Sequence, residues 1–202
     1  HYLEAAVYSL LDTRHLVAVH AACVALDGRG VLLAGVSGAG KTTLAYACAR
    51  RGWVYTADDA SFIVRRSAAR KVLGNPRVFR FRDTAGRLFP EFAGRRHSRR
   101  GNGKPTVEVL TAALPAIRTS GEAEIHHVVF LDRREEMGKA ATLMPLQPEE
   151  VYSRLLWNPW PPEIPGGEER LAAIRRISSA PGHELTYRDL DDVDTMLRAC
   201  ER

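Results

Sequence analysis

Short apolar runs separated by turn residues recur along the chain, and this pattern predicts a series of β-strands. Residues 16–26 and 31–35 form two such runs, and the Asp-Gly turn at residues 27–30 between them predicts a β-hairpin. Further runs predict strands at residues 53–57, 61–64, 71–73, 78–81, 126–132 and 184–187, of which the second and third form another hairpin.

Apolar residues at helical spacing predict α-helices between and around these strands. One helix begins at about residues 40–42 and ends near Arg50 and Arg51, with Gly52 as its cap. Others are expected at residues 2–12, 148–156, 168–177 and 190–200. Strands and helices in this order predict an α/β fold with a mixed sheet, and a chain of 202 residues suits one domain over residues 1–202.

The composition is that of an ordinary globular protein, with 45% hydrophobic and 26% charged residues. No apolar run reaches the roughly 18 residues that a membrane-spanning helix needs, so no membrane association is expected. Three widely spaced cysteines without a CxxC pair predict neither a zinc site nor a disulfide framework, and indicate a reduced, cytoplasmic protein. The sequence begins at His1 rather than Met, which allows for a missing N-terminal segment.

The net charge of +5 owes much to one tract, residues 95–104, inside a segment that we expect to be a mobile basic loop at residues 94–104. Two interpretations are open: a solvated loop, or an electrostatic clamp for a phosphorylated or acidic partner. Nucleic-acid binding is not expected, because no aromatic residues lie between the basic ones to stack on bases. The Trp157–Trp160 segment is either a packed turn or a surface for a partner.

The most specific motif follows the first hairpin directly. Residues 35–42 read Gly-Val-Ser-Gly-Ala-Gly-Lys-Thr, which matches the P-loop pattern between a strand and a helix. Glycines in such a loop let backbone N–H groups turn toward phosphates, and the following helix adds the positive end of its dipole. The motif predicts nucleotide binding by Gly35, Ser37, Gly38, Ala39, Gly40, Lys41, Thr42 and Thr43; the alternative is a glycine-rich turn without function.

Two further features belong with this motif. The acidic pair Asp58-Asp59 ends the strand that follows the P-loop helix, so it should lie at the same edge of the sheet as the loop. One carboxylate there can accept a proton and the other can hold Mg²⁺, although a solvated turn is the alternative. His20 lies on the strand next to the one that leads into the loop, and is either structural or part of the site. Arg77, Arg80 and Arg82 either reach a transferred phosphate or face solvent.

Together, these elements resemble the kinase core of the bacterial HPr kinase/phosphorylase family, whose nucleotide site is similar to that of phosphoenolpyruvate carboxykinase. In that family a histidine lies fifteen residues before the first P-loop glycine, and an aspartate pair begins twenty-three residues after it. His20 and Asp58 stand at those distances from Gly35. The resemblance covers residues 16–66, about a quarter of the chain, and departs from the family at Thr43, where the family has an acidic residue.

The resemblance implies a mixed-sheet P-loop kinase core that uses ATP or GTP with Mg²⁺ to phosphorylate a serine hydroxyl of a peptide or protein. It implies that Asp58 is the general base, that His20 is a catalytic-site residue, and that Lys41 clamps the phosphates. Thr42 would bind Mg²⁺, and Asp59 would support the metal. A small-molecule hydroxyl kinase and a non-catalytic nucleotide-binding module remain open, as does a homo-oligomer.

Overall fold

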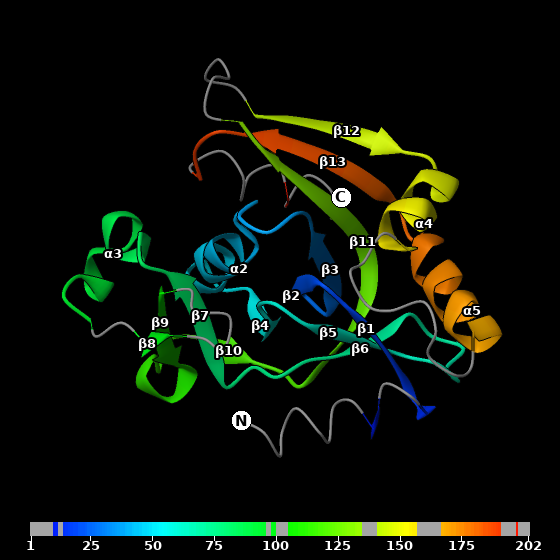
Figure 1. Ribbon diagram of the computed structural model, residues 1–202, viewed down its shortest axis with the longest axis horizontal. Coiled ribbons are helices and arrows are strands. Elements are labelled where there is room, and N and C mark those ends of the chain that lie inside the picture. Colours follow the sequence, from blue (N-terminus) through cyan, green and yellow to red (C-terminus); the bar gives the residue numbers. More distant parts are fainter. Residues whose placement is uncertain are drawn as a thin grey trace.

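The computed structural model describes residues 10–11, 14–95, 98–99, 105–134, 141–156, 167–190 and 197 (Figure 1). Over these residues the chain is a mixed α/β protein with one large curled sheet and a small second sheet. The strands of the large sheet are β1 (Leu16–Val19), β2 (Ala21–Leu26), β3 (Arg29–Ala34), β4 (Val54–Ala57), β5 (Ser61–Val64), β6 (Lys71–Leu73), β10 (Arg118–Thr119), β11 (Glu122–Arg133), β12 (Thr142–Leu146) and β13 (Gly182–Tyr187). The small sheet contains β7 (Val78–Arg82), β8 (Ser98–Arg99) and β9 (Pro105–Leu110).

The helices connect these strands. The described α-helices are α2 (Lys41–Arg50), α3 (Ala85–Leu88), α4 (Pro148–Leu156) and α5 (Gly167–Ser178). Of two 3₁₀ helices, η1 (Pro90–Phe92) lies between β7 and β8 in the sequence, and η2 (Thr111–Ala113) follows β9. Gly52, with φ of +93°, follows the C-cap of α2 in the left-handed conformation that was expected of it.

Both predicted hairpins are present, but the first begins differently from the prediction. β2 pairs antiparallel with β3 and β5 pairs antiparallel with β6. The apolar run at residues 16–26 was expected to be one strand, and this was wrong: it breaks at His20, and β1 turns away to pair with β5. The break places His20 at a junction between two strands instead of inside one.

Strand directions bring the candidate residues to one edge of the large sheet. β11 runs parallel to β3, while β4 and β3 are both antiparallel to β2 and therefore run in the same direction as each other. The carboxyl ends of β3, β4 and β11 thus lie at a common edge, where ligands of open α/β sheets bind. β2 begins at the same edge, because Ala21 pairs with Ala34.

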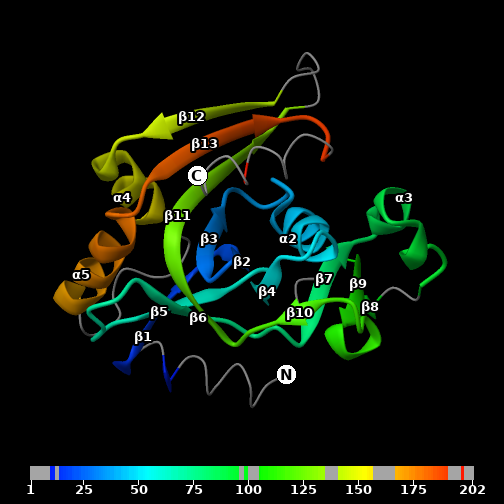
Figure 2. The ribbon, with the colours of Figure 1, turned by 180° about the vertical axis from the view of Figure 1, so that it is seen from behind.

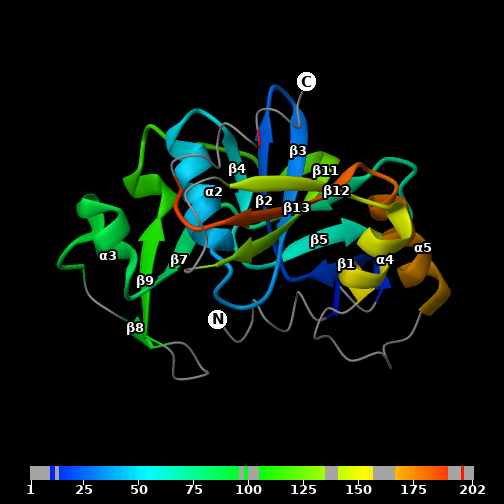
Figure 3. The ribbon, with the colours of Figure 1, turned by 90° about the horizontal axis from the view of Figure 1, so that it is seen from above.

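Two layers cover opposite faces of the central strands (Figures 1 and 2). α2 packs on one face together with β7 and β9, while α4 and α5 cover the other face. Along β11, Val129 and Leu131 belong to the first core and Val128 and Phe130 to the second, as the two-residue period of a strand requires. Seen from above, the small sheet lies toward one end of the molecule and α4 and α5 toward the other (Figure 3).

An aromatic cluster attaches the small sheet to α2. The ring of Tyr46 on α2 lies with its centroid 5.2 Å from that of Phe79, 5.4 Å from that of Phe81 and 4.8 Å from that of Phe89. Phe79 and Phe81 are both buried on β7, so the residues that alternate with them, Arg80 and Arg82, turn the other way. The cluster thereby holds β7 against α2.

The structure confirms several other predictions. The helices at residues 148–156 and 168–177 are α4 and α5, and the predicted strands at residues 126–132 and 184–187 are parts of β11 and β13. β9 and β12 were not predicted. The predicted helices at residues 2–12 and 190–200, the 94–104 loop and the Trp157–Trp160 segment lie wholly or mostly outside the described residues. Within the described part of the chain, no helix has both the length and the apolar character to cross a membrane.

Candidate functional site

The loop between β3 and α2 has the backbone conformation that its glycines permit. Gly35, Gly38 and Gly40 have φ values of +148°, +100° and +93°, a region that residues with a side chain rarely adopt. Space is also limited, since a side chain at Gly35 would meet the Leu131 carbonyl and one at Gly40 would overlap the Tyr187 hydroxyl. The sequence pattern is therefore required by the shape of the loop.

Tyr187, at the end of β13, is a support for this loop that the sequence analysis did not identify. Its hydroxyl donates a hydrogen bond of 2.5 Å to the Ala39 carbonyl, and the side chain is buried. Burial raises the pKa of this phenol to about 12, so the hydroxyl keeps the proton that it donates. The 148 residues between the partners left no local signal for this contact.

Lys41, the first residue of α2, folds back over the loop. Its Nζ donates to the Gly35 carbonyl at 2.7 Å and to the Val36 carbonyl at 3.1 Å. Burial lowers the pKa of this ammonium to about 8, while the charge of Asp59 raises it and that of Arg82 lowers it. An ammonium that is poorly solvated in this way gains much from the arrival of an anion.

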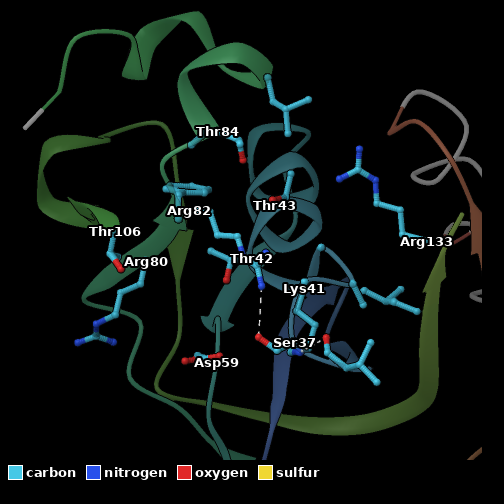
Figure 4. A pocket seen from close by; sticks show the side chains of 18 of the residues that line it. Ser37, Lys41, Thr42, Thr43, Asp59, Arg80, Arg82, Thr84, Thr106 and Arg133 are labelled. Carbon is cyan, nitrogen blue, oxygen red and sulfur yellow. Dashed lines mark hydrogen bonds between the residues drawn. The ribbon is translucent and has the colours of Figure 1, made fainter. Parts of the chain in front are cut away.

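Arg82, the last residue of β7, also contacts the loop. It extends from β7 toward the loop, and its Nη2 donates to Ser37 Oγ at 3.3 Å (Figure 4). In the same view the Arg80 guanidinium points away from Lys41; its Nε lies 3.4 Å from Glu108 Oε1. Of the three arginines considered from sequence, Arg82 is the one that contacts the loop.

His20 and Asp59 form a contact at the sheet edge. His20 Nδ1 lies 3.0 Å from the Asp59 carbonyl oxygen and 3.4 Å from its Oδ1. Since a carbonyl can only accept, the 3.0 Å contact is a hydrogen bond in which Nδ1 carries the proton. In the neutral ring Nε2 is then the nitrogen that can accept a proton. The two side chains are 30% and 36% exposed, so both are accessible to a ligand.

Asp58 is placed differently from its neighbour. The residue is only 4% exposed, and its Oδ2 accepts a hydrogen bond of 2.7 Å from the backbone N–H of Arg80. Asp58 therefore ties the end of β4 to β7, beneath the surface of the site. Asp59 lines the cavity over the loop and Asp58 does not, so the role of Asp58 as general base stays a prediction.

Most of these residues line one cavity of about 720 Å³. It lies over the loop and the start of α2, and its wall includes Thr42, Thr43, Asp59, His20 and Arg82. Thr84 and Thr106 border it on the side of the small sheet, and Arg133 on the side of β11 (Figure 4). Cations and hydroxyls thus surround a space large enough for a nucleotide, within the roughly 300–1,000 Å³ typical of ligand pockets.

The donor groups at one part of this wall suit a magnesium ion. The Thr42 hydroxyl and the Asp59 carboxylate are hard oxygen donors, and Mg²⁺ is usually held by one or two carboxylates together with substrate phosphates. The described residues contain no group of three or more His, Cys, Asp or Glu side chains that could hold a metal by themselves. Thr42 and Asp59 are the residues that the P-loop pattern and the aspartate pair offer for such an ion, and both line the cavity.

Comparisons with known proteins give two similarities. The family model described as "SynChlorMet cassette protein ScmC" matches residues 2–75, fewer than half of the chain, and this segment contains the loop, His20 and the aspartate pair. No curated protein matches the sequence. Among solved structures, the chain is similar to the HPr(Ser) kinase/phosphatase from Coxiella burnetii, at 14% identity and a TM-score of 0.43 over 92% of this chain and 88% of that one. At these values the function has to be argued from the site itself.

Proposed function

We propose that this protein is a phosphotransferase that moves the γ-phosphoryl group of Mg·ATP, or of Mg·GTP, to a hydroxyl group of a peptide or protein. One observation carries the proposal: the glycine loop with its buried lysine and the His20–Asp59 pair line the same cavity. The loop supplies backbone N–H donors and a cation for a polyphosphate, and the pair supplies a proton acceptor for a hydroxyl group.

The loop suits the phosphates through its backbone. Backbone N–H groups in a loop of this conformation form a concave site for anions, and the amino end of α2 adds the positive end of the helix dipole. Lys41 Nζ already lies over the loop carbonyls, where it can also donate to phosphate oxygens. In this arrangement Mg²⁺, bound by Thr42 and Asp59, would neutralise part of the phosphate charge.

Arg82 would act on the transferred group. Charge spreads over the phosphoryl oxygens during transfer, and a positioned guanidinium stabilises it. Arg82 reaches Ser37 across the loop from β7, and Asp58 and the aromatic cluster hold that strand in place. The buried carboxylate of the pair would thus contribute to catalysis by positioning β7.

We assign the proton-accepting role to His20. Its Nδ1–H bond to the Asp59 carbonyl fixes the ring so that Nε2 is the accepting nitrogen of the neutral form. A base that is oriented by a second group in this way is the usual arrangement for activating a hydroxyl. His20 would take the proton of the acceptor hydroxyl as its oxygen attacks the γ-phosphorus and the bond to the nucleoside diphosphate breaks.

Labelled ATP tests the proposal and identifies the acceptor. The purified protein, incubated with γ-labelled ATP, Mg²⁺ and a soluble extract, should transfer label to a polypeptide in a reaction that the Lys41→Ala protein does not perform. Label in a small metabolite instead would make the protein a small-molecule kinase. Binding of ATP without any transfer would leave a nucleotide-binding module.

The lowered pKa of Lys41 predicts a proton uptake when ATP binds. At pH 8.5 this ammonium, with a pKa of about 8, is largely deprotonated, and the polyphosphate should restore its proton. Calorimetry at pH 8.5 in two buffers of different ionisation enthalpy should therefore show uptake of up to about one proton. Lys41→Arg, whose guanidinium stays charged, should show none. Equal uptake by both proteins would contradict the role of Lys41.

The same shift has a defined sign for the stability of the ligand-free protein. The folded state loses the Lys41 proton near pH 8 and the unfolded chain near 10.5, so burial of the charged form costs stability below about pH 8. This cost is relieved as the pH rises from about 8 toward 10.5. The site therefore holds its cation at the expense of stability, which is typical of a ligand-binding group.

A further inference from the structure

A second cavity, of about 670 Å³, lies on the other face of the large sheet, next to α4. Its wall is mostly apolar, and five buried residues from β1, β2, β3, β11 and α4 form much of it: Val19, Ala21, Ala34, Phe130 and Leu155. All five belong to the hydrophobic core beneath α4 and α5. The cavity is therefore the open end of that core, and we call it the apolar cavity.

The arginine of the apolar cavity is paired with two carboxylates. Arg154 Nη1 donates to Glu184 Oε2 at 2.5 Å, and Nη2 donates to Glu150 Oε1 at 2.7 Å. The guanidinium also lies 5.3 Å from the centre of the Phe130 ring. An arginine between two carboxylates does not attract a polyphosphate. This cavity therefore differs in chemistry from the first, which Lys41 and Arg82 line.

The two cavities meet at His20 and at part of the loop. His20, Val36, Ser37, Leu131 and Asp132 line both of them, whereas Lys41, Thr42 and Asp59 line only the first. A molecule in the apolar cavity can therefore reach His20 while a nucleotide occupies the first cavity. An acceptor hydroxyl at His20 would lie next to Val36 and Ser37 of the loop, and so near the phosphates that the loop is proposed to bind.

From this arrangement we infer that the apolar cavity is the acceptor subsite, and that the acceptor carries a large apolar group next to its hydroxyl. The inference rests on the proposed phosphotransferase function. The apolar group fills the space between Phe130, Leu155 and Ala21, while the hydroxyl points to His20. Two sources share this chemistry: an apolar side chain beside a serine in a peptide, and the apolar skeleton of a small alcohol.

A binding experiment with matched probes separates these cases. The whole chain, with Mg²⁺ and a non-hydrolysable ATP analogue, is titrated with N-acetyl-Gly-Ser-Gly-amide and with N-acetyl-Phe-Ser-Gly-amide, and in a second arm with ethanol and 2-phenylethanol. Burial of a phenyl group should tighten binding by about 10–100-fold within a pair of probes. A gain in the peptide arm alone indicates a peptide acceptor, and a gain of equal size in the alcohol arm indicates a small alcohol.

Two tryptophan variants test whether the gain in affinity comes from the apolar cavity. Ser153 is an exposed residue of α4 that lines the apolar cavity, so Ser153→Trp should block it and abolish the gain. Ala172, exposed on α5, lines neither cavity, and Ala172→Trp should keep the gain in full. Nucleotide binding should be unchanged in both variants, because neither residue lines the first cavity.

The outcomes also separate this inference from the proposed function. Equal affinities for the apolar and the glycine probes, or equal losses in both tryptophan variants, would overturn the acceptor subsite even if ATP-dependent transfer occurs. The opposite combination is also informative. If only Ser153→Trp removes the gain from the apolar group, the apolar subsite is supported. If no label then passes from ATP to the Phe-Ser peptide or to the extract, the result counts against the phosphotransferase.

Discussion

Phosphoryl transfer should fall by about 10²–10⁴-fold when His20 is replaced by glutamine, because this is the usual worth of a positioned base. Glutamine keeps a polar side chain that can still donate to the Asp59 carbonyl, but it cannot accept the proton of the hydroxyl. The affinity for Mg·ATP should change much less, since the loop amides, Lys41 and Thr42 remain. Initial rates with saturating ATP, together with the dissociation constant for ATP, measure the two effects separately.

The two aspartates are the controls for this assignment. Asp58→Asn keeps an oxygen at the end of β4 that can accept from the Arg80 N–H on β7, so this protein should retain most of its activity. Asp59→Asn should instead raise the Mg²⁺ concentration needed for half-maximal rate. A loss in Asp58→Asn as large as that in His20→Gln would return the role of the base to Asp58, as the family resemblance implies.

Lys41→Ala should reduce transfer to the background rate and weaken the binding of Mg·ATP. The substitution removes the ammonium that donates to the Gly35 and Val36 carbonyls, and with it the charge that would face the β- and γ-phosphates. Lys71→Ala is the matched control, because Lys71 pairs with Glu122 on the neighbouring strand and lines neither cavity. Wild-type turnover and ATP affinity in Lys41→Ala, or an equal loss in Lys71→Ala, would contradict the phosphate-binding role of the loop.

The local parts of the fold were predictable from the sequence because their signals are local. The Asp-Gly turn, the glycine pattern and the apolar spacing of residues 148–156 indicated the first hairpin, the loop and α4. The break at His20 was not predictable, since residues 16–26 contain no glycine or proline and read as one strand. What breaks the run is tertiary: β1 pairs with β5, more than forty residues away in the sequence.

The site shows the same division between local and distant information. The sequence predicted that His20, the loop and the aspartate pair lie at one edge of the sheet, and the strand directions confirm this position. It did not indicate which aspartate faces the cavity, because that depends on the Arg80 N–H of β7. Tyr187 and the apolar cavity were missed for a similar reason: both depend on how β13 and α4 pack on residues from the first half of the chain.

The pairing of β7 with β9 explains why the middle of the chain was the hardest to predict. β7 and β9 are joined by residues 83–104, a connection that is rich in glycine and arginine. β9 itself alternates buried and exposed residues only in part, and it begins at a proline. Arg82 reaches the loop through this pairing, so its role could not be separated from that of Arg80 before the sheet was known.

A calorimetric titration of the wild-type protein with Mg·ATP shows whether the cavity over residues 35–42 binds the polyphosphate of a nucleotide. We expect saturable binding to one site, with a dissociation constant on the order of 1 μM–1 mM, and competition by inorganic tripolyphosphate, which shares only the phosphates with ATP. A folded protein that binds no Mg·ATP, or that binds it without competition from tripolyphosphate, would contradict this expectation.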